Sequence, residues 1–161
     1  MAANPIPEGF HTVTPHIIVK NGAKALDFYK NAFGAEEICR MPGPDGESIM
    51  HAEIKIGDSP IMLASEWVEQ GAVSPETVGG TPVTIHLYVN DVDAAMKKAA
   101  DAGCDVTMPP TDMFWGDRYG KLKDPFGHHW SIATHIEDLT PEEIGQRAAK
   151  AFGGGGECGK A

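Results

Sequence analysis

The feature that most constrains the fold of this chain is an internal repeat. Residues 14–35 align with residues 84–105, and the octapeptide TPHIIVKN that opens the first copy matches TIHLYVND in the second. His16 and His86 therefore occupy the same position of the repeat. A chain of 161 residues is long enough for one substantial core but short for two independent domains. We therefore expect one compact unit built from two halves.

Each copy of the repeat continues with the same order of expected elements. A helical spacing of apolar residues covers residues 23–33 and residues 93–102, and a glycine follows each, as is common at helix C-termini. Beyond the first helix the apolar period falls to two, as in residues 50–56, which is typical of a half-buried strand. Turn sequences then separate further strands. Each half is thus predicted to be a strand, a helix and a three-stranded meander.

These elements predict an α+β fold of two tandem βαβββ modules. The stretch between the copies is rich in glycine and proline, which favours an irregular linker. Thr140, followed by Pro141 and Glu143, has the pattern of a capped helix start, and the glycines at 153–156 predict the end of order. The expected divisions are an N-terminal segment (1–11), module 1 (12–65), the linker (66–82), module 2 (83–136), a C-terminal helix (137–152) and a disordered glycine-rich tail (153–161).

Composition narrows the classes of partner and the compartment. A net charge of −10 and a pI near 5.0 argue against nucleic acid and anionic membranes as partners, since both need a basic face. The three cysteines, Cys39, Cys104 and Cys158, are an odd number at wide spacings, which fits a reducing compartment. No apolar stretch approaches the ~20 residues of a membrane span, and the N-terminus lacks the pattern of a secretory signal. We expect a cytoplasmic protein.

Two motifs carry a family resemblance. The helix end LDFYKNAFG at 26–34 and the turn DPFGHHW at 124–130, within a doubled βαβββ unit, resemble the vicinal oxygen chelate superfamily of glyoxalases, bleomycin-resistance proteins and dioxygenases. The resemblance covers residues 12–136 and is greatest to the PhnB-like, glyoxalase-like branch. It implies a curved mixed sheet with helices on the convex face, a concave cavity for a small molecule, and a homodimer. Enzymes of the family hold a divalent metal there with His and Glu side chains, and the metal acts as a Lewis acid.

The chain departs from the ligand set that this resemblance implies. Aligned on the first motif, the usual first-strand histidine position holds Thr14, and the equivalent position of the second copy holds Thr84. The glutamate expected after the DPxG turn aligns with Ser131, and Glu53 is placed near the remaining carboxylate position. Hydroxyl groups are weak ligands for a divalent ion, so the standard site is lost.

A shifted metal site is one hypothesis for what replaces it. His16 and His86 lie two residues beyond the missing ligands and so return to the same strand face, because side chains alternate with period two. With Glu53 they form a mixed set suited to one zinc, nickel, manganese or iron ion, and Glu53 is also the candidate catalytic base. The alternative is that these histidines line the pocket with no metal at all.

Further residues are candidates for contact with substrate. Trp115 could stack on a planar molecule and Arg118 could bind a carboxylate or phosphonate; the alternatives are a core tryptophan and an Asp117–Arg118 surface pair. Trp67 and Trp130 are expected to be packing residues, and Cys39, with no neighbouring histidine, is not expected to be a nucleophile. The full set of predicted substrate contacts is His51, Tyr88, Trp115, Arg118 and Ser131.

Three functions compete. The first is a metal-dependent lyase, isomerase or dioxygenase acting on a small oxygenated molecule with His16, His86 and Glu53 as ligands. The second is a metal-free protein of the bleomycin-resistance type, in which the concave faces of a dimer sequester an aromatic or cationic ligand. The third, a structural or interaction module, fits the polar strand faces least well.

Overall fold

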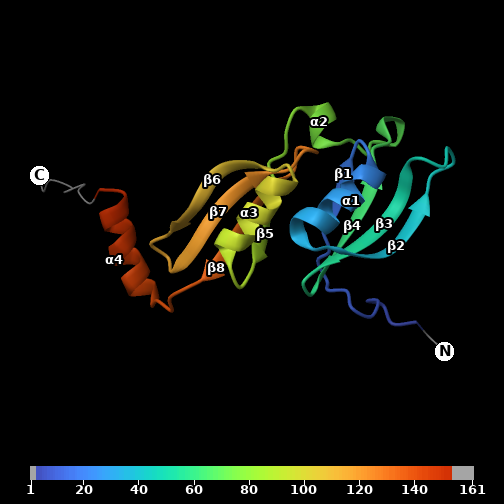
Figure 1. Ribbon diagram of the computed structural model, residues 1–161. Coiled ribbons are helices and arrows are strands. Elements are labelled where there is room, and N and C mark those ends of the chain that lie inside the picture. The colour runs from blue at the N-terminus through green and yellow to red at the C-terminus, as the bar shows by residue number, and fades with distance from the viewer. Residues whose placement is uncertain (1–2, 154–161) are drawn as a thin grey trace, which may run out of the picture.

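Two four-stranded mixed sheets, one per module, form the fold in the computed structural model, which describes residues 3–153 (Figure 1). In module 1 the order is β1-β4-β3-β2, and in module 2 it is β5-β8-β7-β6. The elements of module 1 are β1 (His16–Val19), α1 (Gly22–Phe33), β2 (Glu36–Pro42), β3 (Ile49–Ile56) and β4 (Ser59–Ser65). Those of module 2 are β5 (Thr84–Tyr88), α3 (Val92–Ala102), β6 (Asp105–Asp112), β7 (Asp117–Lys123) and β8 (His129–His135). The predicted α+β fold of two βαβββ modules is confirmed.

The pairing within the two sheets is equivalent. In each sheet the first strand pairs in parallel with the last, and the other strands pair antiparallel as a meander. His16 lies opposite Met62 on β4, and His86 lies opposite Ser131 on β8. The two histidines therefore occupy the same place in their sheets, as the sequence repeat predicts.

Local sequence signals explain where the two main helices begin and end. The Asn21 side chain accepts a hydrogen bond from the Lys24 amide at 3.0 Å, and α1 ends at Gly34, which adopts the left-handed conformation with φ 67°. Asp91 caps α3 in the same way, and Gly103 follows it. These caps set the entry and exit of each helix on its sheet.

The linker and the C-terminal segment contain short regular elements. Between the modules lie a 3₁₀ turn, η1 (Val68–Gln70), and a one-turn helix, α2 (Pro75–Val78), so the linker is less irregular than expected. The α4 helix (Pro141–Ala151) begins at the predicted capping box of Thr140 and Glu143. Within residues 3–153 no helix is both long and apolar enough to cross a membrane. The tail predicted to be disordered lies outside the described residues, except for its first glycine.

A shared core joins the two modules. The α1 and α3 helices contact each other and lie side by side in Figure 1. Tyr29 of α1 is fully buried, and its hydroxyl donates to Asp124 Oδ2 of module 2 at 2.7 Å. Trp130, also fully buried as a packing residue should be, donates from Nε1 to the same oxygen at 2.8 Å. The modules are thus fixed relative to each other by a buried polar contact within one apolar cluster.

Candidate functional site

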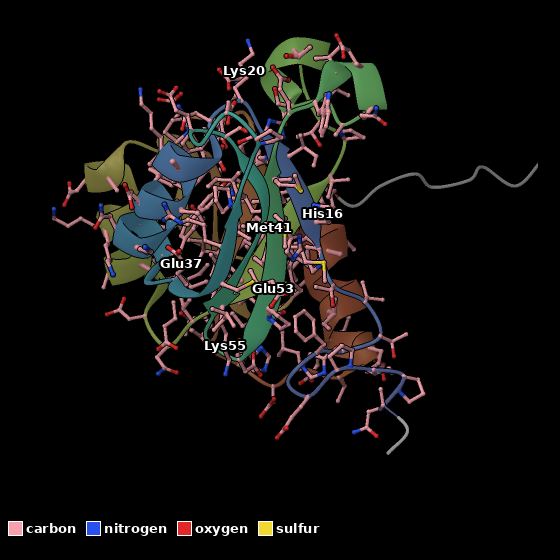
Figure 2. All side chains as sticks on the ribbon, turned by 90° about the vertical axis from the view of Figure 1, so that its right-hand side faces the viewer. His16, Lys20, Glu37, Met41, Glu53 and Lys55 are labelled. Carbon is pink, nitrogen blue, oxygen red and sulfur yellow. The ribbon has the colours of Figure 1, made fainter. Side chains whose placement is uncertain are left out.

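Strand alternation gives each sheet one face against its helix and one face turned away from it. On β1, Ile17 and Val19 are buried in the core, whereas His16 points to the opposite side. Figure 2 shows His16 and Glu53 on the side of the sheet away from α1, and Glu37, which binds Lys30 of α1, on the other. We call the outer side the module 1 face; it carries His16, Cys39, Met41, His51, Glu53 and Met62.

A row of potential ligand atoms crosses the module 1 face. His16 pairs in register with Met62, Met62 with Glu53, and Glu53 with Cys39. The His51 Nε2 atom lies 3.3 Å from Glu53 Oε1, and the His51 ring lies 6.2 Å from that of His16. Imidazole, thiol, thioether and carboxylate groups from all four strands therefore meet on one surface.

The electrostatics of this face favour the neutral forms of His16 and Cys39. Burial lowers the pKa of His16, and the adjacent His51 lowers it further. Burial also raises the pKa of the Cys39 thiol, and the charge of Glu53 adds to that shift. The neutral thiol is the weaker nucleophile, although the structure places His51, which is not near Cys39 in the sequence, within 4.8 Å of its sulfur.

The second sheet presents an aromatic surface, which we call the module 2 face. The His86 ring stacks on Tyr119 with 5.9 Å between centroids and meets the edge of Tyr88 at 4.6 Å. His86 Nδ1 lies 2.7 Å from the hydroxyl of Ser131. Trp115 meets Tyr119 edge to face at 5.6 Å. Four rings thus form one platform on the side of the sheet away from α3.

A buried carboxylate organises this platform. Asp117 is only 5% exposed, and it accepts hydrogen bonds from Trp115 Nε1 at 3.0 Å and from the Tyr88 hydroxyl at 3.2 Å. His135 Nδ1 lies 2.7 Å from its other oxygen, and hydrogen bonds to Asp117 and then Asp138 raise the pKa of His135. Burial lowers the pKa of His86, while the charge of Asp117 opposes that shift. The carboxylate fixes the orientation of the rings and adds negative charge beneath them.

The predicted site residues divide between the two faces, with one exception. His16, His51 and Glu53 lie on the module 1 face, whereas His86, Tyr88, Trp115 and Ser131 belong to the module 2 face. Arg118 points to the helix side of its sheet, where it binds Asp93 at 2.6 and 2.8 Å and Asp112 at 2.9 Å. Asp117 and Arg118 point to opposite faces and do not pair, so we leave Arg118 out of the site.

The ligand trio predicted from the sequence, His16, His86 and Glu53, is not assembled at metal-binding distance. The position of module 1 that is equivalent to Ser131 is Met62 on β4, because both lie opposite a repeat histidine, and Glu53 is its neighbour on β3. Among the described residues, the group of three His, Cys, Asp or Glu ligand atoms within 4.8 Å of one another consists of Cys39, His51 and Glu53. His16 and His86 do not belong to it.

A groove on module 1 adds a residue that sequence reasoning left out. Its volume is about 510 Å³, and its lining includes His16, Ser48, Met50, Glu66, Trp67 and Gln70. Trp67 is 49% exposed rather than a packing residue, because it pairs with Ala72 in an isolated bridge outside the sheet. Asp117, Tyr119, Met41 and Met62 were also absent from the predicted set; the place of Met62 follows only from the strand register that pairs it with His16.

Comparison with known proteins identifies the family. The model of the Glyoxalase/Bleomycin resistance protein/Dioxygenase superfamily matches residues 9–132. The chain belongs to this superfamily. An uncharacterised relative, Rv0887c of Mycobacterium tuberculosis (strain H37Rv), is 43% identical over 146 residues, which cover 89% of this chain and 85% of that protein.

Two solved structures show the same superfamily fold. The PhnB protein from Bacillus cereus has a TM-score of 0.59 at 14% identity, covering 77% of this chain and 99% of that one. The fosfomycin resistance protein FosX from Listeria monocytogenes, solved with Mn(II) and sulfate, has a TM-score of 0.60 at 19% identity, covering 83% of this chain and 95% of that one. At these identities the likeness concerns the fold alone.

The residues at the metal-ligand positions of the superfamily do not fit a divalent metal here. The resemblance aligns those positions with Thr14, Thr84 and Ser131, and the strand register adds Met62 on β4 as the equivalent of Ser131. The Thr14 hydroxyl donates to the His11 carbonyl at 3.3 Å, and the Ser131 hydroxyl is engaged by His86. A set of three hydroxyls and a thioether lacks the imidazole and carboxylate groups that hold such ions in proteins.

Proposed function

We propose that this protein binds a small planar molecule on the module 2 face and acts as a small-molecule binding protein with no metal at the superfamily's usual position. The observation that carries the proposal is the platform of His86, Tyr88, Tyr119 and Trp115 over the buried Asp117. The loss of the usual ligands at Thr14, Thr84 and Ser131 supports it.

The platform has the properties of a stacking surface. Tyr88 is 67% exposed although its hydroxyl is held by Asp117, so its ring is oriented without being covered. Each aromatic pair formed with a ligand contributes about 0.5–1.5 kcal/mol beyond area burial. The buried carboxylate and the net charge of −10 favour a cationic or neutral ligand over an anionic one.

A metal-dependent enzyme is the second candidate. In this case His16, His86 and Glu53 would be the ligands of one zinc, nickel, manganese or iron ion, and Glu53 would also be the candidate base. The observation in its favour is the 3.3 Å contact between His51 Nε2 and Glu53 Oε1, since an imidazole beside a carboxylate is a common acid–base pair. Its weakness is that His86 stands on the other sheet from Glu53.

Titration with a planar aromatic cation tests the proposal. Ethidium is titrated into the protein by calorimetry, with and without EDTA. Replacing Tyr88→Ala should weaken binding about two- to tenfold, the equivalent of one stacking contact. Val68→Ala, which removes an exposed apolar side chain outside both faces, is the matched control and should change nothing.

Two other outcomes would count against the proposal. Equal affinities in Tyr88→Ala and the control would place binding away from the platform. Loss of binding on chelation would favour the metal-dependent candidate instead. The homodimer and the cytoplasmic location stay predictions; light scattering should give twice the 17.2 kDa chain mass if the dimer forms.

A further inference from the structure

We propose that Cys39, His51 and Glu53 form a binding site for a zinc-class divalent cation on the module 1 face. The three residues come from two neighbouring strands, β2 and β3, and Cys39 pairs in register with Glu53. None of them is Thr14, Thr84, Met62 or Ser131, the residues that align with the superfamily's ligand positions, although Glu53 lies beside Met62 in the sheet. The site is therefore a different one, and it is independent of the aromatic platform of module 2.

The geometry is close to that of a tetrahedral ion. The Cys39 sulfur, a ring nitrogen of His51 and a carboxylate oxygen of Glu53 all lie within 4.8 Å of one another. With zinc bonds of about 2.0–2.3 Å, the ligand atoms of a tetrahedron lie about 3.3–3.8 Å apart. The His51 to Glu53 separation of 3.3 Å is already at that spacing. Rotation of the Cys39, His51 and Glu53 side chains, none of which is fully buried, would bring the other ligand atoms to the same spacing.

A bulge in β2 puts the thiol on this face. The pairing register shifts between Glu37 and Cys39, so Ile38 is an extra residue. In a regular strand with no bulge, Cys39 would lie two residues beyond Glu37 and would share its face, where Glu37 binds Lys30 of α1. Bulges commonly re-aim a side chain in this way next to functional sites. The bulge therefore comes directly before Cys39, one of the three proposed ligands.

The donor chemistry matches one class of ion. Thiolate, imidazole and carboxylate are the three ligand types that zinc takes from proteins, whereas calcium and magnesium prefer oxygen alone. The His51 Nε2 and Glu53 Oε1 atoms face each other at 3.3 Å, so both donor atoms are already turned toward the same point. Three protein ligands leave a fourth position, and the ring of His16 lies 6.2 Å from that of His51.

Cobalt(II), a spectroscopic substitute for zinc, tests the site in the full-length chain without a histidine tag, kept reduced by a phosphine. We expect one equivalent to bind with the visible bands of a tetrahedral ion and a near-ultraviolet band from sulfur to cobalt charge transfer. Added zinc should remove both. Cys39→Ser should abolish the near-ultraviolet band, and Glu53→Gln should weaken zinc binding at least tenfold.

Matched variants separate the site from other donors. Cys104→Ala removes a buried thiol of module 2, and Glu36→Gln removes an exposed carboxylate of the same strand as Cys39; both should leave the spectrum unchanged. Thermal unfolding confirms that each variant is folded, and X-ray absorption of the zinc-loaded wild type should show one sulfur ligand. Absence of saturable binding, or a charge-transfer band that persists in Cys39→Ser, would overturn the proposal.

Discussion

The buried contact between Tyr29 and Asp124 is predicted to stabilise the joint between the modules. Asp124 is 3% exposed; its Oδ2 accepts from Tyr29 and Trp130, and its Oδ1 from the amides of Phe126 and His128. Tyr29→Phe removes one hydrogen bond to a charged group at a fully buried position. Such bonds contribute about 1.5–3 kcal/mol, so we expect the free energy of unfolding in urea to fall by that amount.

Tyr88→Phe is the matched control for this prediction. Its hydroxyl also donates to a buried carboxylate, but at 3.2 Å and from a ring that is mostly exposed. Because water can replace that bond, the loss should stay below about 1 kcal/mol. Equal losses in Tyr29→Phe and Tyr88→Phe would refute the reasoning, because they would mean that burial of the donor does not matter.

The pH dependence of the unfolding free energy, compared between the wild type and Tyr29→Phe, gives a second test. Burial, and then the charge of Asp124, raise the pKa of Tyr29 well above its ordinary value of 10.0. The hydroxyl therefore ionises in the unfolded chain before it does in the folded one, so its contribution to stability is complete well below pH 10 and is lost progressively as the pH rises through that value. The stability difference between wild type and Tyr29→Phe should shrink between pH 9 and about pH 11. A stability difference that stays constant over this pH range would contradict the burial of the Tyr29 hydroxyl beside Asp124.

The remaining predictions concern two glycines and two histidines. A Cβ on Gly120 would collide with the sulfur of Met96, so Gly120→Ala should lower the unfolding free energy by about 1–3 kcal/mol. Gly145→Ala in exposed α4, where nothing lies within 4 Å, should instead raise it by about 0.5–1 kcal/mol, and the same sign for both would contradict the packing. In NMR titrations His135 should titrate above 6.5, because of its carboxylate partners, and His86 below 6.5, because of burial. The opposite order would disprove the environment assigned to the module 2 face.

Local signals in the sequence were enough to predict most of the fold. The repeat placed His16 and His86 at equivalent positions, and the register of the two sheets confirms it. Gly34 and the Thr140–Glu143 capping box mark helix ends through contacts within a few residues. Such signals depend on neighbours in the chain, so they can be recognised without knowing the tertiary packing.

The candidate site was harder to predict, because it depends on which residues of different strands lie opposite one another. Alternation correctly placed His51 and Glu53 on one face, but only the register shows that Met62, not Glu53, is the equivalent of Ser131. The bulge that brings Cys39 beside Glu53 leaves no clear mark in the sequence. A shift of one residue moves a side chain to the other face, so an unseen bulge changes the membership of a site.

The two faces show how one repeat can produce different chemistry. The histidine is the same in both copies, but it pairs with the thioether Met62 in module 1 and with the hydroxyl residue Ser131 in module 2. The next strand contributes Glu53 in module 1 and Lys121 in module 2. Potential metal-ligand atoms therefore gather on module 1 and aromatic rings on module 2. Because the two sets share no residue, Cys39→Ser should leave ethidium binding intact and Tyr88→Ala should leave cobalt binding intact. Coupled losses would instead mean that both faces serve one site.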